Sequence, residues 1–164
     1  MTTDIKKQED LGISWLFQEQ FGFSQIPLNQ SYEAYFKSLL VCANGDGTLA
    51  DAERDWVIGY ASAYNRDPAI IEKLKVYKAD EDLETLFSGD PLIIETRRSL
   101  LLDAIQACAA DGEYNEKERA VVLKGAKALN ISEDELKKIE EIYFETVKLR
   151  EKRLAVLYPK GLPY

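Results

Sequence analysis

Apolar residues recur three and four positions apart along most of the chain, which is the spacing of amphipathic α-helices. One such face comprises Tyr32, Tyr35, Phe36, Leu39 and Ala43, and another comprises Leu136, Ile139, Tyr143 and Val147. No stretch alternates apolar and polar residues as a half-buried strand does. The pattern therefore predicts an all-α fold, with helices near residues 9–21, 31–43, 50–64, 68–78, 81–87, 91–109, 115–129 and 132–157.

Several of these helices carry recognisable start signals. Two begin with an N-cap residue followed by the proline favoured at the first helical position, at Asp67-Pro68 and Asp90-Pro91. Two others begin with a capping box, Asn115 with Glu118 and Ser132 with Glu135. The helix at 31–43 is preceded by two residues of N-cap type, Asn29 and Ser31.

The chain contains an internal repeat. Shifted by 65 residues, "DGTLADAERDWVIGYASAYN" lies over "DGEYNEKERAVVLKGAKALN" without a gap. The identical pairs include Asp46 with Asp111, Gly47 with Gly112, Glu53 with Glu118, Arg54 with Arg119 and Asn65 with Asn130. Large Trp56 and Tyr60 are matched by small Val121 and Gly125, which suggests two halves of complementary volume packed about a pseudo-two-fold axis.

Length and repeat together predict one domain over residues 1–164, a bundle of seven or eight helices. Repeat one spans 31–78, repeat two spans 91–145, and residues 1–8 are expected to be flexible.

The doubled motif resembles a known family. The segments "VCANGDGTLADAERDWVIGYASAYN" and "ACAADGEYNEKERAVVLKGAKALNIS" each place Asp-Gly after an alanine-containing helix and a Glu seven residues after the Asp. They are similar to the TerB-like domain of tellurite-resistance and stress proteins, over roughly residues 30 to 150. The resemblance implies an all-helical domain with an acidic surface near the Asp-Gly turns that holds divalent cations.

Charge and composition exclude several functions. The net charge of −8 argues against nucleic-acid binding, which needs a basic face. The chain has no histidine, so Ser-His and Cys-His catalysis are excluded. No targeting segment or membrane-length apolar run is present in the sequence. We expect a cytoplasmic, non-enzymatic stress-response protein.

Four repeated carboxylates are the candidate site. "CANGDGTLADAER" has the outline of an EF-hand, but Cys42 stands where that loop needs its first Asp, so a true EF-hand is not expected. If the two turns lie side by side, Asp46, Glu53, Asp111 and Glu118 form one acidic site. Oxygen ligands alone favour Ca²⁺, Mg²⁺ or Mn²⁺.

The alternative for these carboxylates is helix capping. Asn115 and Glu118 form a capping box, but Ala50 cannot act as a side-chain cap, and a Thr48 and Asp51 cap would leave Glu53 without a capping role. Capping therefore accounts for Glu118 more readily than for Glu53.

Three further features bear on partners. Cys42 and Cys108 are expected to be buried thiols, with a disulfide as the alternative. The aromatic group Trp15, Phe17, Phe21 and Phe23 is expected to pack on the core. Residues 146–164 hold five basic side chains against one acidic, leaving a net charge of −12 on the remainder.

The alternative function is a helical interaction module that binds an unidentified protein, or a second copy, through its acidic or aromatic surface without metal.

Overall fold

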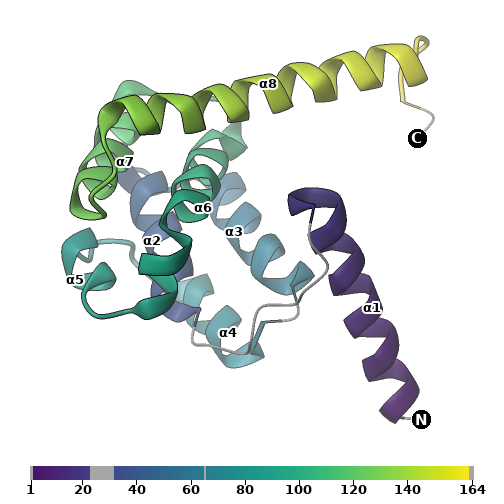
Figure 1. Cartoon of the computed structure of the whole chain (residues 1–164), viewed down its shortest axis with the longest axis horizontal. Coiled ribbons are helices and arrows are strands. Elements are labelled where there is room, and N and C mark those ends of the chain that lie inside the picture. Colours follow the sequence, from purple (N-terminus) through teal and green to yellow (C-terminus); the bar gives the residue numbers. More distant parts are fainter. Residues whose placement is uncertain (1, 23–31, 65, 163–164) are drawn as a thin grey trace.

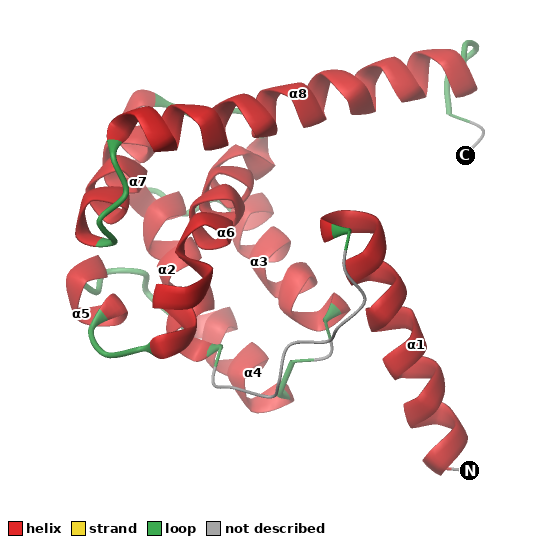
Figure 2. Ribbon diagram, viewed as in Figure 1, coloured by secondary structure: helices red, strands yellow, loops and turns green. Residues whose placement is uncertain are grey.

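The computed structural model describes residues 2–22, 32–64 and 66–162, with side chains from residue 10 onward. This part of the chain is helical and contains no strand (Figures 1 and 2). Its elements are α1 (Thr2–Phe21), α2 (Glu33–Ala43), η1 (Asn44–Asp46), α3 (Asp51–Ala63), α4 (Pro68–Val76), α5 (Leu83–Phe87), α6 (Pro91–Cys108), η2 (Ala109–Asp111), α7 (Glu116–Ala128) and α8 (Glu133–Leu157). The all-α prediction is confirmed, and eight α-helices lie close to the predicted ranges.

The helix starts follow the predicted chemistry with two exceptions. Asp67 and Asp90, each directly before the helical proline, cap α4 and α6 by accepting hydrogen bonds from backbone N–H groups that follow that proline. The first helix begins at Thr2 rather than at residue 9. The N-cap of α2 is Tyr32, which makes no side-chain capping bond, while Asn29 and Ser31 lie outside the described residues.

The core lies between α2 and α6, which pack closely against each other. Residues of both helices are removed from solvent there, among them Leu39, Leu40, Leu100, Leu101 and Ile105. Burying a side chain of this size stabilises a fold by roughly 1.5–3 kcal/mol, so this seam is a major source of stability. The other helices surround this pair and position the two Asp-Gly turns at its end.

The C-terminal ends of α3 and α7 share one geometry. The amide of Arg66 donates to the Ala61 carbonyl at 3.0 Å, and the amide of Ile131 donates to the Ala126 carbonyl at 2.8 Å. Asn130, just before Ile131, has a φ of 55°. In α7 this bond closes a helix that ends in a left-handed residue, Asn130. Arg66 and Ile131, which are equivalent in the repeat, therefore make the same backbone hydrogen bond although their side chains differ.

The space beside Gly125 is filled from a different element than expected. A Cβ at Gly125 would lie 3.3 Å from Leu83 Cδ1 and 3.6 Å from Phe87 Cζ. The volume left by this glycine is therefore occupied by α5, which belongs to neither copy, and not by Tyr60 of the first copy. The expected large-to-small match across the repeat is wrong at this position.

Two helices extend away from the bundle. Figure 1 shows the second half of α8 running past the other helices and α1 lying at the side. The segment α1 packs through Ile13 and Phe17 against Tyr64. Trp15 is 62% exposed, so the expectation that it packs on the core is wrong, whereas Phe17 is buried as expected and Phe23 lies outside the described residues. None of the described helices is both long and apolar enough to cross a membrane.

Candidate acidic site at the two Asp-Gly turns

The two Asp-Gly turns have the same local structure. Each follows a helix with one 3₁₀ turn, η1 or η2, that ends at a left-handed glycine, with φ of 91° at Gly47 and 105° at Gly112. Glycine adopts this conformation without steric cost. Asp46 Oδ1 accepts the Thr48 amide at 2.8 Å, and Asp111 Oδ1 accepts the Glu113 amide at 3.0 Å. Each aspartate thus closes its own turn with one oxygen.

The glutamates occupy the third position of the following helices. Glu53 Oε2 accepts the Ala50 amide at 2.6 Å, and Glu118 Oε2 accepts the Asn115 amide at 2.8 Å. Asn115 returns the bond through its side chain, whereas Ala50 has no side-chain acceptor. The alternative cap by Thr48 and Asp51 does not form, because α3 begins after Ala50. Glu53 does have a capping role, since it accepts the Ala50 amide.

Each turn packs on the helix that follows the other turn. Segment η1 contacts α7, and η2 contacts α3. Gly45 shows how close the approach is, because a Cβ there would lie 2.9 Å from the Glu118 Cα. The arrangement brings the N-terminal turns of α3 and α7 together, and with them the two glutamates.

Glu53 and Glu118 form a buried pair of carboxyl groups. The two residues are 1% and 3% exposed. Burial, followed by the interaction with Glu118 and the charge of Asp111, raises the pKa of Glu53 to about 8, although the bond from the Ala50 amide opposes the shift. Burial also raises the pKa of Glu118, while its bond with Glu53 lowers it. Ionising both carboxyl groups is therefore costly near neutral pH, and the two groups titrate as a pair.

The aspartates lie outside this pair. Asp46 and Asp111 are exposed, yet the charge of Asp111 raises the pKa of both glutamates and that of Asp46 raises the pKa of Glu118. The four predicted carboxylates are thus close enough to interact electrostatically, but only the two glutamates are buried together within the described part of the chain. There, no group of three or more Asp, Glu or Cys side chains has the spacing of a metal site.

The donor set nevertheless suits a hard cation. Glu53 Oε1 is buried and has no hydrogen-bond partner among the described residues. Each aspartate retains an oxygen that does not close its turn. Carboxylate oxygens are the ligands that Mg²⁺, Ca²⁺ and Mn²⁺ prefer. The two glutamates and the remaining aspartate oxygens are therefore the groups at these turns that could hold such an ion.

The two cysteines lie beside this pair. Cys42 and Cys108 are buried and not joined by a disulfide, as their apolar surroundings predicted. Burial raises the pKa of Cys42 to about 12, and burial followed by the charges of Cys42, Glu118 and Glu53 raises the pKa of Cys108 further still. Both thiols are therefore protonated and unreactive at neutral pH.

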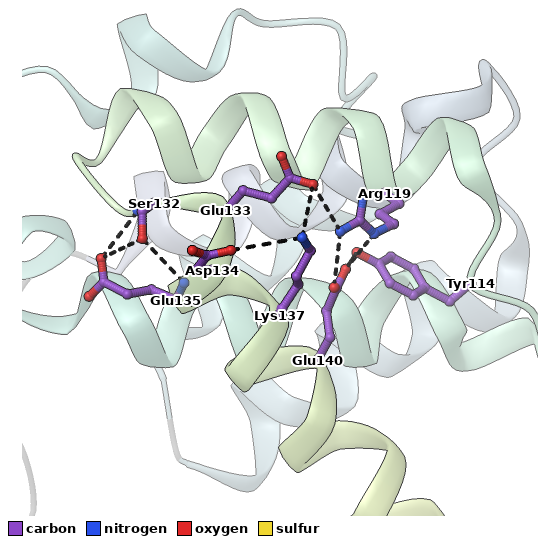
Figure 3. Close-up of polar contacts among 8 residues, drawn as sticks. All are labelled: Tyr114, Arg119, Ser132, Glu133, Asp134, Glu135, Lys137 and Glu140. Carbon is purple, nitrogen blue, oxygen red and sulfur yellow. Dashed lines mark hydrogen bonds and ion pairs between the residues drawn. The ribbon is translucent and has the colours of Figure 1, made fainter.

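A polar network next to the second turn lies between α7 and α8. The Arg119 Nε lies 2.9 Å from Glu140 Oε1, and the Tyr114 hydroxyl donates to the same oxygen at 3.3 Å (Figure 3). Glu133, near the start of α8, is 3.7 Å from Arg119. The pairing joins α7 to α8. In the first copy, Arg54 instead donates to the Leu74 carbonyl at 2.7 Å.

Sequence reasoning missed Asp103, Arg66 and Glu140, which are charged residues buried in the described part of the chain. Asp103 accepts hydrogen bonds from the hydroxyls of Tyr35 at 2.7 Å and Tyr60 at 2.9 Å. Arg66 is 8% exposed and stacks on the Tyr32 ring. The signal for Asp103 was a charge between the apolar neighbours Leu101 and Ile105 of a core helix. Arg66 had no comparable signal, because it follows a helix end where charged residues are usually exposed.

The comparisons with known proteins agree with the geometry. No family model matches this chain, and no curated protein does. A crystal structure of a tellurite resistance protein from Nostoc punctiforme PCC 73102 matches with a TM-score of 0.84 and 42% sequence identity, over 95% of this chain and 98% of that one. Identity at this level over nearly the whole length shows common ancestry as well as a common fold. The chain belongs to the TerB-like family of tellurite resistance proteins.

Proposed function

We propose that this chain is a cytoplasmic, tellurite-resistance-like stress protein that acts by binding, and that its paired glutamates take up a divalent cation. Glu53 and Glu118 are the central ligands, and Asp46 and Asp111 are the outer ones. The observation that carries the proposal is the buried Glu53 Oε1, which has no partner among the described residues and belongs to a pair with no basic neighbour in ion-pair contact there.

The energetics of the pair support exchange of a proton for a cation. Two buried carboxylates repel each other, and the raised pKa of Glu53 reflects that cost together with burial. A divalent ion offsets both negative charges, whereas the shared proton offsets one. Binding in this form releases one proton from Glu53, so affinity increases as the pH rises towards about 8, the pKa of Glu53.

Binding is favoured over catalysis by the chemistry of the remaining groups. The chain has no histidine to act as a general base near pH 7. Its two thiols are buried, with pKa values far above their usual range, and so are poor nucleophiles. The acidic site therefore provides charge and oxygen ligands without an activated nucleophile beside them.

Thermal unfolding of metal-stripped protein tests the proposal. Scans with Ca²⁺, Mg²⁺, Mn²⁺ and Zn²⁺ should show stabilisation by one of the first three. A ligand at 100 times its Kd adds about 2.7 kcal/mol, which raises the Tm of a domain of this size by roughly 5–10 °C. The increase should be larger at pH 8 than at pH 6, because the pair loses its proton in this range.

Two variants make the result specific to the site. Glu53→Gln with Glu118→Gln removes the paired carboxylates and should abolish the increase in Tm. Asp51→Asn with Glu116→Gln is the matched control, since these exposed acids begin the same two helices and occupy equivalent positions of the repeat. An unchanged Tm with every cation, or equal increases in both double variants, would exclude the glutamate pair as a cation site.

A second candidate function rests on the projecting half of α8. Figure 1 shows this half clear of the bundle, and it exposes apolar side chains that include Leu149, Leu154, Val156 and Leu157. Residues 146–164 carry +4 while the remainder of the chain carries −12. The charges are complementary between copies, so this candidate is self-association through α8.

Sedimentation of the full chain at low and high salt tests self-association. The mass should exceed that of a monomer at low salt and fall towards it at high salt, because surface charges are screened. Leu154→Glu with Leu157→Glu should give a monomer, whereas Leu11→Glu, on exposed α1, should not. A monomer at every salt concentration would exclude this candidate and leave the cation proposal unaffected.

A further inference from the structure

A small cavity lies beneath α1, away from the acidic site. It has a volume of about 100 Å³ and is lined by aromatic rings from three helices, including Phe17 of α1, Phe36 of α2 and Tyr60 of α3. The ring pairs around it are close, with centroids 5.9 Å apart for Phe36 and Tyr60. An apolar cavity of about 150 Å³ in another protein holds benzene. This cavity is smaller, so it accommodates a compact apolar group as it stands, and a single ring requires outward movement of the lining side chains.

One cation faces this apolar space. Arg66 lines the cavity, and its guanidinium carbon lies 3.6 Å from the centre of the Tyr32 ring. The residue is more than nine-tenths buried, and its Nε has no hydrogen-bond acceptor in the described part of the chain. Leaving one buried N–H group of a guanidinium without an acceptor is costly.

The surroundings of Arg66 do not supply a counter-charge. The Arg66 side chain makes no ion pair with any described carboxylate. Asp103 lies behind the aromatic wall, where its Oδ2 accepts bonds from both Tyr35 and Tyr60. Asp103 does not line the cavity, and these two hydroxyls engage its Oδ2, whereas its Oδ1 has no partner in the described part of the chain.

The second copy shows what this position looks like without a cavity. Ile131 is the equivalent of Arg66 and has the same closing hydrogen bond, but its side chain is part of the main core. The arginine is therefore not needed to end the helix. A charged residue at a position whose counterpart is apolar and buried indicates a role in binding.

We propose that this cavity binds a small organic anion, a monocarboxylate whose apolar body is no larger than one aromatic ring. The ring packs among the aromatic side chains, and the carboxylate accepts hydrogen bonds from the Arg66 guanidinium. Arginine matches the geometry of a carboxylate with paired donors. Ser99, exposed at the rim of the cavity on α6, supplies a hydroxyl to the same end of the ligand.

The ligand also bears on the position of α1. Phe17 lines the cavity, and Tyr64 joins the same helix by donating a hydrogen bond to Gln20. An occupied cavity adds contacts between α1 and the bundle. We therefore expect binding to slow hydrogen exchange in the last turns of α1.

Benzoate is the probe that tests the proposal on the full chain. Titration followed by ¹H–¹⁵N spectra should shift the Arg66 Nε–H signal, with a Kd of about 1 mM or lower. Benzyl alcohol, which has the ring without the charge, and inorganic phosphate, which has charge without the ring, should each bind at least tenfold more weakly. Arg66→Gln should raise the Kd for benzoate at least tenfold, while Arg98→Gln, an exposed arginine on α6, should leave it within about twofold.

Arg66→Ile is a control for a folding defect, because it introduces the residue type that the second copy has at the equivalent position, Ile131. It should be folded by circular dichroism and lose benzoate binding. Benzoate bound equally well by Arg66→Gln or Arg66→Ile would overturn the proposal. So would equal affinity for benzyl alcohol, or no shift of the Arg66 signal in about 10 mM benzoate.

Discussion

The two sequence copies share a backbone and differ in how they fill it. Both end a helix in an Asp-Gly turn, start the next with a Glu that accepts the N-cap amide, and close that helix in the same way. The first copy then carries Tyr60 and Arg66, whereas the second carries Gly125 and Ile131. An aromatic cavity lies beside Tyr60 and Arg66, whereas side chains of α5 fill the space beside Gly125.

The difference separates two roles within one bundle. In the second copy, apolar packing and the bond between Arg119 and Glu140 fix α7 against α5 and α8. In the first copy, a charge is buried beside a cavity and the equivalent Arg54 binds a backbone carbonyl. The glutamates belong to both copies, because each turn lies on the other copy's helix. Changes at equivalent positions should therefore have unequal effects.

The largest loss of stability is expected where η1 packs against α7. Gly45→Ala places a Cβ 2.9 Å from the Glu118 Cα, and backbone cannot move aside as a side chain can. We expect a loss of about 3 kcal/mol in the free energy of unfolding, the upper range for overpacking. Urea unfolding measures it. The equivalent residue of the second copy is already an alanine, Ala110.

Gly59→Ala is the control for this substitution. Gly59 lies inside α3 and nothing comes within 4 Å of a Cβ there. Alanine should stabilise the helix by about 0.5–1 kcal/mol, because glycine is the weaker helix former. A loss of stability at Gly59, or none at Gly45, would contradict the close packing of the two turns.

The second inequality concerns the repeated arginines. Arg119→Ala leaves Glu140, which is 7% exposed, without its cation, and should cost about 2 kcal/mol. Arg54→Ala removes one bond to the Leu74 carbonyl and should cost about 1 kcal/mol or less. Urea unfolding at low and moderate salt measures both. Equal losses would show that the network in Figure 3 adds nothing to the second copy.

Helix positions were predictable because they depend on local patterning and capping, as at Asp67, Asp90 and Ser132. The glutamates could be selected because they recur at a fixed distance after each Asp-Gly. The Asp103 network was not predictable, since Tyr35 lies 68 residues from it and Tyr60 lies 43. Contacts at such separations depend on how helices pack, which local spacing does not encode.

The third expected difference is in how the free energy of unfolding depends on pH. The buried glutamates should contribute to this dependence, and exposed acids of the same helices should not. With a folded pKa of about 8 for Glu53 and an unfolded value near 4.5, the folded chain binds more protons than the unfolded chain between these values. The stabilisation is complete below about pH 4.5 and is lost as the pH rises through 8. From pH 6 to pH 8 the free energy of unfolding should fall by roughly 1–2 kcal/mol.

Glu53→Gln tests that assignment, because glutamine is neutral at both pH values. Its stability should be nearly independent of pH between 6 and 8, whereas Glu116→Gln, at an exposed position of α7, should keep the slope of the parent. Asp103 has a pKa of about 6 through burial, so its contribution falls largely below this window. A parent and Glu53→Gln with identical slopes would show that the pair does not hold a proton.

The smallest effect is expected at Asp103 and its equivalent in the first copy, Ser38. Tyr35→Phe removes one of two hydrogen bonds to a buried carboxylate, while Ser38→Ala removes a hydroxyl that donates to the Ala34 carbonyl of its own helix. We expect a loss of about 1 kcal/mol for Tyr35→Phe and less than about 0.5 kcal/mol for Ser38→Ala. The cost of Tyr35→Phe should be lower at pH 5 than at pH 8, because below its pKa of about 6 the Asp103 carboxyl is neutral and needs a donor less. Urea unfolding at the two pH values measures this, and a cost for Tyr35→Phe that does not change with pH would mean that Asp103 keeps one charge state across the range.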